Sequence, residues 1–470
     1  MVVLLEASIG LGAYLYFRDD KPSKYPDEWD SRVAELAAYA ADARDLTYKH
    51  PVYVDFLTED EYSEQTRTQE SELTPEDRKD LENTTELLRA LGLASGDLDL
   101  FQATNDLNDT GTLAYYDPET ERVTVRGTEM TVDLKVTLVH ELTHVLQDQY
   151  FDLEQLPGYE NLDEDDELPD EAQDAFEADR ALVEGDAMRI EYEYVDDLSS
   201  DEADEYYNAN AEDVSGAEED LGDVPAALQA FQAAPYILGQ PLVEIIADDG
   251  NDAVDDAFRD PPSTTEHMWD PRTYLDGDEP TDLDRPNPPD GVRKKDEIDH
   301  GVMGAVDLFV ILGDRIDPFQ ALDATDGWGN ARYVSYETDR RTCVRMALDG
   351  DSDTDDQELR SALDAWVAAA PAESNAAVTD LGDGHSQLES CDPGVDVDAA
   401  NDRALDLMTL PATRIQIASD GVYNGASLDD AWAVGDCFVR KFTIDELTAE
   451  VTDELQAKAD DAFESCGAGG

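Results

Sequence analysis

The chain has 470 residues, of which 41% are hydrophobic and 8% are aromatic. This apolar content excludes a disordered acidic tail and is sufficient for two or more folded domains. The chain carries 114 acidic against 32 basic residues, and its formal charge of −82 argues against nucleic-acid binding. Because the acidic residues occur along the whole chain, we interpret them as an adaptation to molar salt, which screens their mutual repulsion. The alternative is a polyanionic surface that binds cations or basic partners.

The first segment, residues 1–20, is mostly apolar as far as Phe17 and ends at Arg18-Asp19-Asp20. No positively charged region precedes the apolar residues, and no clear small-residue cleavage site follows them. We expect the remnant of a secretion signal or membrane anchor here, through which the chain would attach to a membrane. The alternative is a buried first helix.

The predicted elements that follow mix helices with short strands. An amphipathic pattern predicts a helix over 27–46, and alternating residues predict a strand over 52–56. Thr74 and Pro75 supply an N-cap hydroxyl and a proline at the first helical position, so a second helix begins there, and Gly92 marks its end. Residues 113–116 and 122–126 flank a turn and predict a β-hairpin.

The next helix is predicted over 131–150 and is apolar nearly all round, which is typical of a helix inside a domain. Another helix is predicted over 170–194. The very acidic stretch 199–224 favours a loop or a weak helix, and the apolar stretch 226–246 returns to a core. A segment rich in proline and aspartate, 276–290, is the best candidate for a linker.

We therefore divide the chain after the hydrophobic segment 1–20 into a first α+β domain, 21–285, and a second α+β region, 286–470. The second region has a predicted helix over 303–312 and a hairpin over 332–348. Further helices are predicted over 357–368 and 444–463.

All four cysteines lie in the second region and form no CxxC pair, which argues against a zinc ribbon. Their order favours two local disulfides, Cys343 with Cys391 and Cys437 with Cys466. The alternative is four buried thiols in a cytoplasmic protein.

The acidic run 349–355 resembles a calcium loop in composition, but its spacing does not fit an EF-hand. Counted from Asp351, the sixth position is Asp356 rather than glycine, and the twelfth is Ala362 rather than glutamate. We therefore expect a solvated loop.

The strongest motif is His140-Glu141-Leu142-Thr143-His144, in the middle of the apolar helix. Residues four apart on a helix project from the same side, so His140 and His144 can both bind one zinc ion. Glu141 can then activate a zinc-bound water as a general base. Unpaired imidazoles in a buried helix would be costly without a metal, which weighs against a purely structural role.

The third metal ligand must come from another segment. Gln147 and Tyr150 stand where a metzincin would have glycine and histidine, which excludes that class. We predict Glu184 on the next helix, with Gly185 and Ala187 small enough to allow close packing on the motif helix. Glu177 and His267 remain alternatives. Asp186 is a candidate to orient a ligand histidine, or it is simply solvated.

Together, the motif at 140–144 and the segment Glu184-Gly185-Asp186-Ala187 resemble the gluzincin branch of zinc metallopeptidases, and in particular a family of haloarchaeal surface proteins. The resemblance covers roughly residues 51–274. It implies a zincin-like fold, zinc held by His140, His144 and Glu184, and Glu141 as the base. It also implies that the strand 122–126 lies along the cleft and pairs with an extended peptide substrate.

The expected function is thus zinc-dependent hydrolysis of peptide bonds at the cell surface of a halophile. The alternative is a non-catalytic surface binding or structural protein on a zincin scaffold. A weaker alternative is a metal-dependent hydrolase that acts on another amide or on an ester. An oxyanion donor is also needed, and Tyr194, Tyr236 and His267 are candidates.

Overall fold

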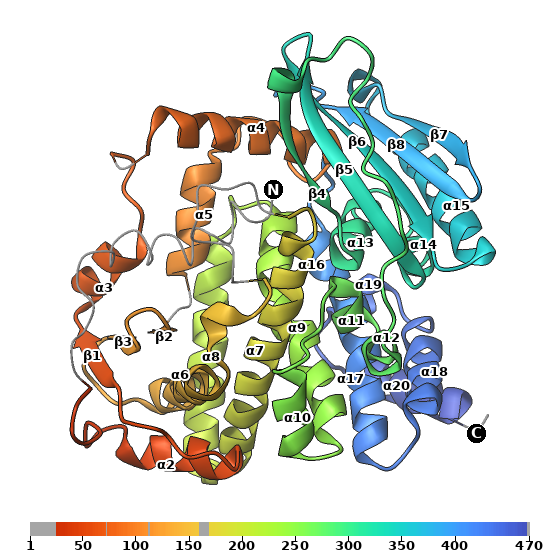
Figure 1. Cartoon of the computed structure of the whole chain (residues 1–470). Helices are drawn as coiled ribbons and strands as arrows, with labels where there is room; N and C mark the ends of the chain where they lie inside the picture. The colour runs from red at the N-terminus through yellow and green to blue at the C-terminus, as the bar shows by residue number, and fades with distance from the viewer. Residues whose placement is uncertain (1–24, 72, 111–112, 159–168, 468–470) are drawn as a thin grey trace.

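The computed structural model describes residues 25–71, 73–110, 113–158 and 169–467 (Figure 1). The hydrophobic segment expected over 1–20 lies outside these ranges. Within them, no helix combines the length and the apolar character needed to cross a membrane.

The first part of the chain forms helices around a small sheet. Its elements are α2 (Ala34–Ala43), β1 (Tyr53–Leu57), α3 (Glu59–Thr66), α4 (Pro75–Leu91), α5 (Leu100–Asp109), β2 (Ala114–Asp117) and β3 (Arg122–Arg126). Thr74 caps α4 and Gly92 ends it in the left-handed region at φ 78°, as the sequence predicts.

The small sheet has the strand order β1-β3-β2, with β1 parallel and β2 antiparallel to β3. The expectation that 122–126 pairs with substrate is therefore wrong. Both edges of β3 are already hydrogen-bonded to neighbouring strands. One of these strands, β1, comes from a distant segment, so the hairpin pattern in the sequence did not reveal it. The strand of the hairpin that lies at an edge of this sheet is β2.

A group of long helices follows. Its members are α6 (Val132–Phe151), α7 (Ala172–Asp196), α8 (Ser200–Asp220) and α9 (Ala226–Ala247), and the short helices after them are α10 (Asn251–Ala257), α11 (Thr265–Trp269) and α12 (Pro271–Asp276). Figure 1 shows α7, α8 and α9 with their axes nearly aligned, beside α6.

Of the two alternatives over 199–224, a loop or a weak helix, the helix is the one that forms, as α8 over most of that stretch. Ser199 and Glu202 cap its start reciprocally, with the Glu202 N–H donating to Ser199 Oγ at 3.4 Å. Tyr206 packs in a small apolar cluster with Val132 and Val136 of α6. Tertiary packing thus stabilises a helix whose charge alone argues against it.

Two glycines set the closest approach between helices. A Cβ on Gly185 of α7 would lie 2.2 Å from the carbonyl oxygen of Gly239 on α9, and a Cβ on Gly239 would lie 2.1 Å from the carbonyl oxygen of Ala181. We expected the small residues around Glu184 to pack on the motif helix. Gly185 instead faces α9, because the partner of a helix face depends on topology.

The second region is built on a five-stranded antiparallel sheet of order β4-β5-β6-β8-β7. Its elements are β4 (Glu297–Val302), α13 (Ala305–Gly313), α14 (Pro318–Thr325), β5 (Trp328–Thr338), β6 (Arg341–Gly350), α15 (Asp353–Ala369), β7 (Ala377–Gly382) and β8 (His385–Cys391). The predicted hairpin over 332–348 is confirmed as β5 and β6.

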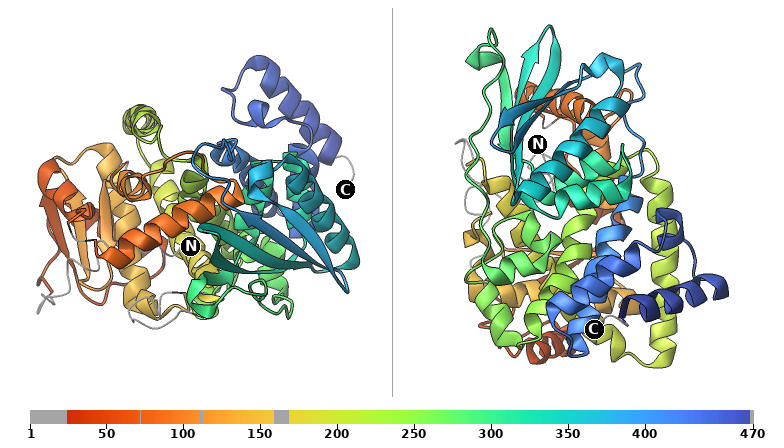
Figure 2. Two further views of the ribbon diagram at one scale, coloured as in Figure 1. Left: turned by 90° about the horizontal axis from the view of Figure 1, so that it is seen from above. Right: turned by 90° about the vertical axis from the view of Figure 1, so that its right-hand side faces the viewer.

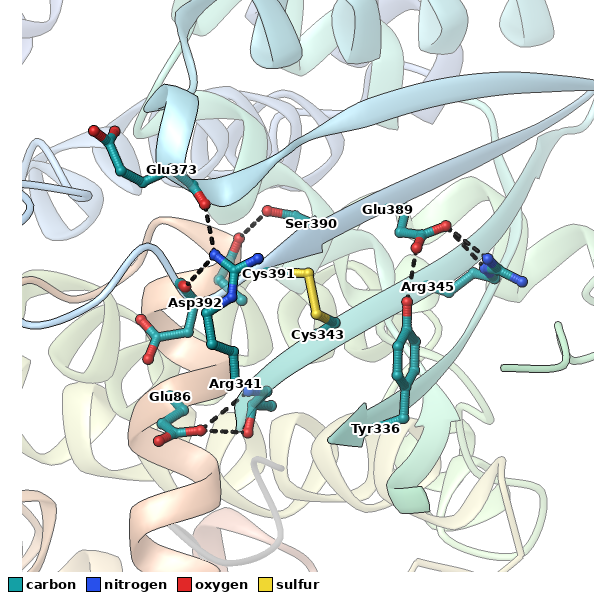
Figure 3. The surroundings of a disulfide bond; sticks show 12 residues. Glu86, Tyr336, Arg341, Cys343, Arg345, Glu373, Glu389, Ser390, Cys391 and Asp392 are labelled. Carbon is teal, nitrogen blue, oxygen red and sulfur yellow. Dashed lines mark hydrogen bonds and ion pairs between the residues drawn. A yellow bond between two sulfur atoms is a disulfide. The ribbon is translucent and has the colours of Figure 1, made fainter. Parts of the chain in front are cut away.

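Helix α4 packs against this sheet although it belongs to the first part of the chain (Figure 3). The hydroxyl of Thr342 donates to Glu86 at 2.6 Å, and Ser390 donates to the carbonyl oxygen of Ala90 at 2.6 Å. Arg89 and Asp392 form a buried bidentate ion pair at 2.8 Å. Polar contacts of α4 therefore join the two regions.

The chain ends in helices α16 (Ala404–Leu407), α17 (Thr409–Tyr423), α18 (Leu428–Val439), α19 (Ile444–Leu447) and α20 (Asp453–Gly467). The last predicted helix is thus split in two. Figure 2 shows α20 on the outside of the molecule. Both predicted disulfides are confirmed: Cys343–Cys391 joins β6 to β8, and Cys437–Cys466 joins α18 to α20.

The two regions share one hydrophobic core. Its largest cluster includes Leu182 and Leu238 from the first region and Tyr333 and Met346 from the sheet. The predicted linker is also held in place, because Leu283 is buried and the amide N–H of Thr281 donates to Gly329 at 3.0 Å. This proline-rich segment is therefore an ordered strap over the sheet.

Candidate metal centre

Three side chains from two helices converge on one point. His140 and His144 lie one turn apart on α6, and Glu184 lies on α7. Glu184 Oε2 is 3.1 Å from His140 Nε2 and 3.4 Å from His144 Nε2. One donor atom from each residue lies within 4.8 Å of the other two.

These distances fit a tetrahedral zinc site. Two ligands about 2.0–2.1 Å from zinc in tetrahedral geometry lie roughly 3.3 Å apart, and the observed spacings fall on either side of that value. The donor set of two imidazoles and one carboxylate is one that catalytic zinc sites use. His140 and His144 are each 8% exposed, so the group is largely enclosed by protein.

The second nitrogen of each histidine has its own partner. His140 Nδ1 is 3.0 Å from Glu191 Oε2, and His144 Nδ1 is 2.8 Å from Gln147 Oε1. Both partners are acceptors, so each Nδ1 carries the proton and each Nε2 lone pair is left to face the metal position. The ring orientation and the tautomer required of a metal ligand are therefore set in advance.

Asp186 supports His144 indirectly, through Gln147. It accepts a hydrogen bond from Gln147 Nε2 at 3.0 Å and pairs with Arg44 at 2.8 Å, and the side chains of Arg44 and Asp186 are both fully buried. Asp186 was expected either to orient a ligand histidine or to be solvated. It is buried, and it reaches His144 through Gln147.

The electrostatics of the three donors are strongly coupled. Burial alone would lower the pKa of His140, but the hydrogen bonds to Glu184 and Glu191 outweigh it and raise that pKa well above its usual range. Burial would likewise raise the pKa of Glu184, yet His144 and His140 hold it well below its usual value. The two imidazoles and the carboxylate of Glu184 thus shift each other's pKa in opposite directions.

Glu141 is 7% exposed and contacts the small sheet. The amide N–H of Tyr116 on the edge strand β2 donates to Glu141 Oε2 at 2.8 Å. Burial raises the pKa of Glu141, and the neighbouring His144 and His140 oppose this rise. A carboxylate of this kind can hold and release a proton close to the metal position.

Tyr236 on α9 is the aromatic candidate that lies close to this group. Desolvation raises its pKa first, followed by the negative charge of Glu184, while Arg180 opposes the rise. Glu141 also acts on it. Tyr236 therefore lies within electrostatic reach of both the predicted base and the predicted third ligand.

The remaining candidates lie in other surroundings. Both ring nitrogens of His267 face backbone groups, the N–H of Ser263 at 3.1 Å and the carbonyl oxygen of Asp278 at 3.2 Å. Tyr194 packs edge-on against Tyr39. Glu177 lies 3.5 Å from Arg180 and is not part of the three-donor group.

Sequence reasoning missed Glu191, Gln147 and the N–H of Tyr116. Gln147 follows His144 by three residues and Glu191 follows Glu184 by seven, so helical periodicity places each beside a predicted ligand. That spacing is the signal that could have found them. The contribution of Tyr116 comes from the backbone, so its side-chain identity carries no signal.

Comparison with known proteins covers only part of the chain. Residues 292–397, which contain the five-stranded sheet, match a family model described as a domain of unknown function (DUF8575). No curated protein and no solved structure matches the chain. The family match does not include the three-donor group, so the chemistry of that group rests on its own geometry.

Proposed function

We propose that this chain is a zinc-dependent peptidase with a zincin-like catalytic region, acting at the surface of a halophilic cell. The observation that carries the proposal is the convergence of His140, His144 and Glu184 at tetrahedral spacing beside the carboxylate of Glu141. A site that only stabilises structure has no use for such a base.

The chemistry follows from the donors and the base. Zinc, when bound, polarises a substrate carbonyl and makes a water molecule acidic enough to act as a nucleophile near neutral pH. Glu141 accepts the proton of the attacking water and later delivers it to the leaving amine. The N–H of Tyr116 holds Oε2 of Glu141, so Oε1 is the atom that takes the proton in this scheme.

An oxyanion donor completes the scheme, and we assign this role to Tyr236. A phenol hydroxyl close to Glu184 and Glu141 can donate to the negative charge that develops on the carbonyl oxygen. Replacing Tyr236 with phenylalanine should lower kcat by roughly 10²–10³-fold and leave bound zinc unchanged. An unaltered kcat would remove Tyr236 from the mechanism.

The edge strand β2 supports a peptide as the substrate. In the sheet order β1-β3-β2, one side of β2 is not paired with another strand of that sheet, and the N–H of Tyr116 already points from it to Glu141. An extended peptide can pair with such an edge by backbone hydrogen bonds, which brings its peptide bonds close to the base.

The location is inferred from the disulfides and the charge. Two disulfides are typical of an oxidising environment outside the cytoplasm. The formal charge of −82 suits molar salt. Attachment to a membrane through residues 1–20 remains part of the proposal.

A peptide library in molar KCl tests the function. The wild-type chain loaded with zinc should cleave a subset of the library, and Glu141→Gln should keep its zinc and lose cleavage by roughly 10²–10⁴-fold. Glu193→Gln, an exposed glutamate on α7, is the matched control and should cleave normally. Wild-type protein that binds zinc and cleaves nothing would favour the scaffold alternative, and equal cleavage by wild type and Glu141→Gln would reject the mechanism.

A further inference from the structure

A second acidic group joins three segments that are far apart in the sequence. Glu266 lies on α11, Asp278 lies just after α12, and Asp351 lies in the turn between β6 and α15. One carboxylate oxygen from each lies within 4.8 Å of the other two. Among the described residues, no lysine or arginine forms an ion pair with any of the three.

The side chain of Glu266 indicates that the group of three carboxylates lacks a binding partner. Its residue is 3% exposed, and its buried Oε1 atom has no hydrogen-bond partner in the described part of the chain. A buried polar atom without a partner is costly, and an ionised one more so. Burial and the charges of Asp351 and Asp278 raise the pKa of Glu266 to about 9.

The chemistry of the three donor groups indicates which kind of cation could bind between them. All three donors are carboxylate oxygens, which hard divalent cations prefer, and no histidine or cysteine belongs to the group. Calcium binds oxygen at about 2.3–2.6 Å, so two of its ligands can lie up to about 5 Å apart, which matches the observed spacing. Asp351 is exposed, so water can supply the remaining ligands on that side.

We propose that Glu266, Asp278 and Asp351 form a calcium site that ties the predicted catalytic region to the five-stranded sheet. The acidic run 349–355 was rejected as an EF-hand, and the site proposed here does not use that geometry. Only Asp351 of the run contributes, and its partners come from two other segments.

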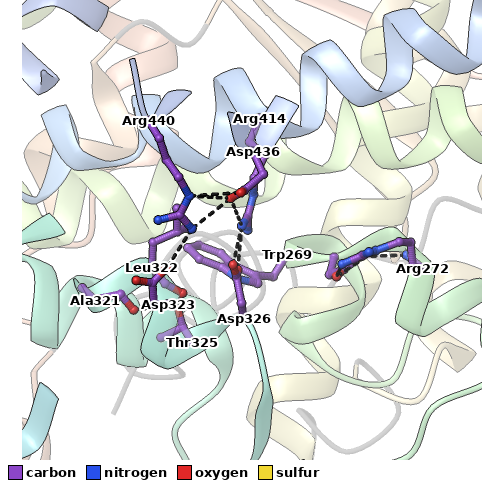
Figure 4. A network of polar contacts seen from close by, with 11 residues as sticks. Trp269, Arg272, Ala321, Leu322, Asp323, Thr325, Asp326, Arg414, Asp436 and Arg440 are labelled. Atoms are coloured by element: carbon purple, nitrogen blue, oxygen red, sulfur yellow. Dashed lines mark hydrogen bonds and ion pairs between the residues drawn. The ribbon is translucent and has the colours of Figure 1, made fainter. Parts of the chain in front are cut away.

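The surroundings explain why a cation at this position matters. Near the site, Thr281 of the proline-rich strap donates to Asp349 at the end of β6 at 2.8 Å. Trp269, at the other end of α11, donates to Asp326, which also binds Arg414 (Figure 4). Calcium would add a cross-link between α11, the strap and the β6–α15 turn by binding three carboxylates that otherwise repel one another.

Direct binding tests the proposal on the full chain in molar KCl. Metal-stripped protein should take up one calcium ion per chain, measured by elemental analysis after equilibrium dialysis. Terbium should bind in the same place with luminescence sensitised by Trp269, and calcium should displace it. A wild-type chain that takes up no calcium would overturn the proposal.

Substitutions of single carboxylates, with a matched control, test whether calcium binds at this position. Asp351→Asn changes an exposed residue and should fold normally, and it should bind calcium at least tenfold more weakly. Glu266→Gln should show the same loss. Asp353→Asn, two residues from Asp351 and also exposed, should bind as the wild type does. Undiminished binding in Asp351→Asn and Glu266→Gln would place the ion elsewhere and refute the assignment.

The calcium site is independent of the proposed zinc chemistry. Glu141→Gln and His140→Ala should keep their calcium, and Asp351→Asn should keep its zinc. Calcium should also raise the melting temperature of the wild type and of Asp353→Asn, but not that of Asp351→Asn. Failure of peptide cleavage would therefore leave this proposal intact, and the reverse also holds.

Discussion

The Nδ1 atom of His140 lies 3.0 Å from Oε2 of Glu191, two turns beyond Glu184 on the same helix. Glu184 faces Nε2 of the same ring at 3.1 Å. One face of α7 thus contacts both nitrogens of one imidazole, which fixes the ring plane as well as its position. Glu191 therefore fixes the orientation of the His140 ring, which the proposed zinc binding requires.

Removing this support should weaken metal binding without removing a ligand. Glu191→Ala should lower zinc affinity by roughly 10–100-fold, because the ring loses its acceptor and its orientation. Competition with a chromogenic chelator measures the change. Glu193→Ala, exposed on the same helix, should bind zinc normally. Equal affinity in the two variants would show that Glu191 has no role in positioning His140.

The buried pair of Arg44 and Asp186 should matter for stability as well as for the metal. Arg44→Met removes the buried pairs with Asp186 and Asp255 but leaves Asp186 paired with Arg189 at 3.0 Å, so it should lower the free energy of unfolding by about 1.5–3 kcal/mol. Denaturant unfolding in molar KCl measures this loss. The control is Arg32→Met, which removes an exposed pair with Asp30 and should change stability by less than about 1 kcal/mol.

The stability of the protein should depend on pH through Asp174, a buried acid that accepts hydrogen bonds from Thr265. Burial raises its pKa from 3.8 to about 6. The folded state therefore holds the proton more tightly than the unfolded state. This contribution to stability is complete below the unfolded pKa and is lost as the pH rises through the folded one.

Asp174→Asn removes that titration. Relative to the wild type, the variant should gain roughly 3 kcal/mol between about pH 4 and about pH 7, measured from denaturant midpoints across that range. The hydrogen bond from the Thr265 hydroxyl lowers the pKa of Asp174, so in Thr265→Val the loss of stability with rising pH should be larger and should extend to higher pH. A constant difference between wild type and Asp174→Asn at every pH would contradict this account.

The contact between α7 and α9 should tolerate no side chain at Gly185. A Cβ there would lie 2.2 Å from a backbone oxygen, which cannot move like the tip of a flexible side chain. Gly185→Ala should destabilise the fold by about 1–3 kcal/mol or more, despite the better helix propensity of alanine. Gly467→Ala in α20 meets no atom within 4 Å and should be neutral or slightly stabilising. Thermal unfolding of both variants distinguishes a backbone clash from a general effect of alanine.

The sequence by itself determined the helix with the motif, its burial and the two histidines on one side of it. These follow from local periodicity, because a helix fixes the relative directions of residues four apart whatever surrounds it. The local disulfides, the hairpin over 332–348 and the ends of α4 were predictable for the same reason.

Only the tertiary structure decided which surfaces these elements meet. It placed β3 between two strands, turned Gly185 toward α9 and formed α8 against α6. It also brought Glu266 and Asp278 to Asp351. Such relationships join segments separated by tens to hundreds of residues, and they arise from burial of apolar surface, which has no direction and leaves no spacing in the sequence.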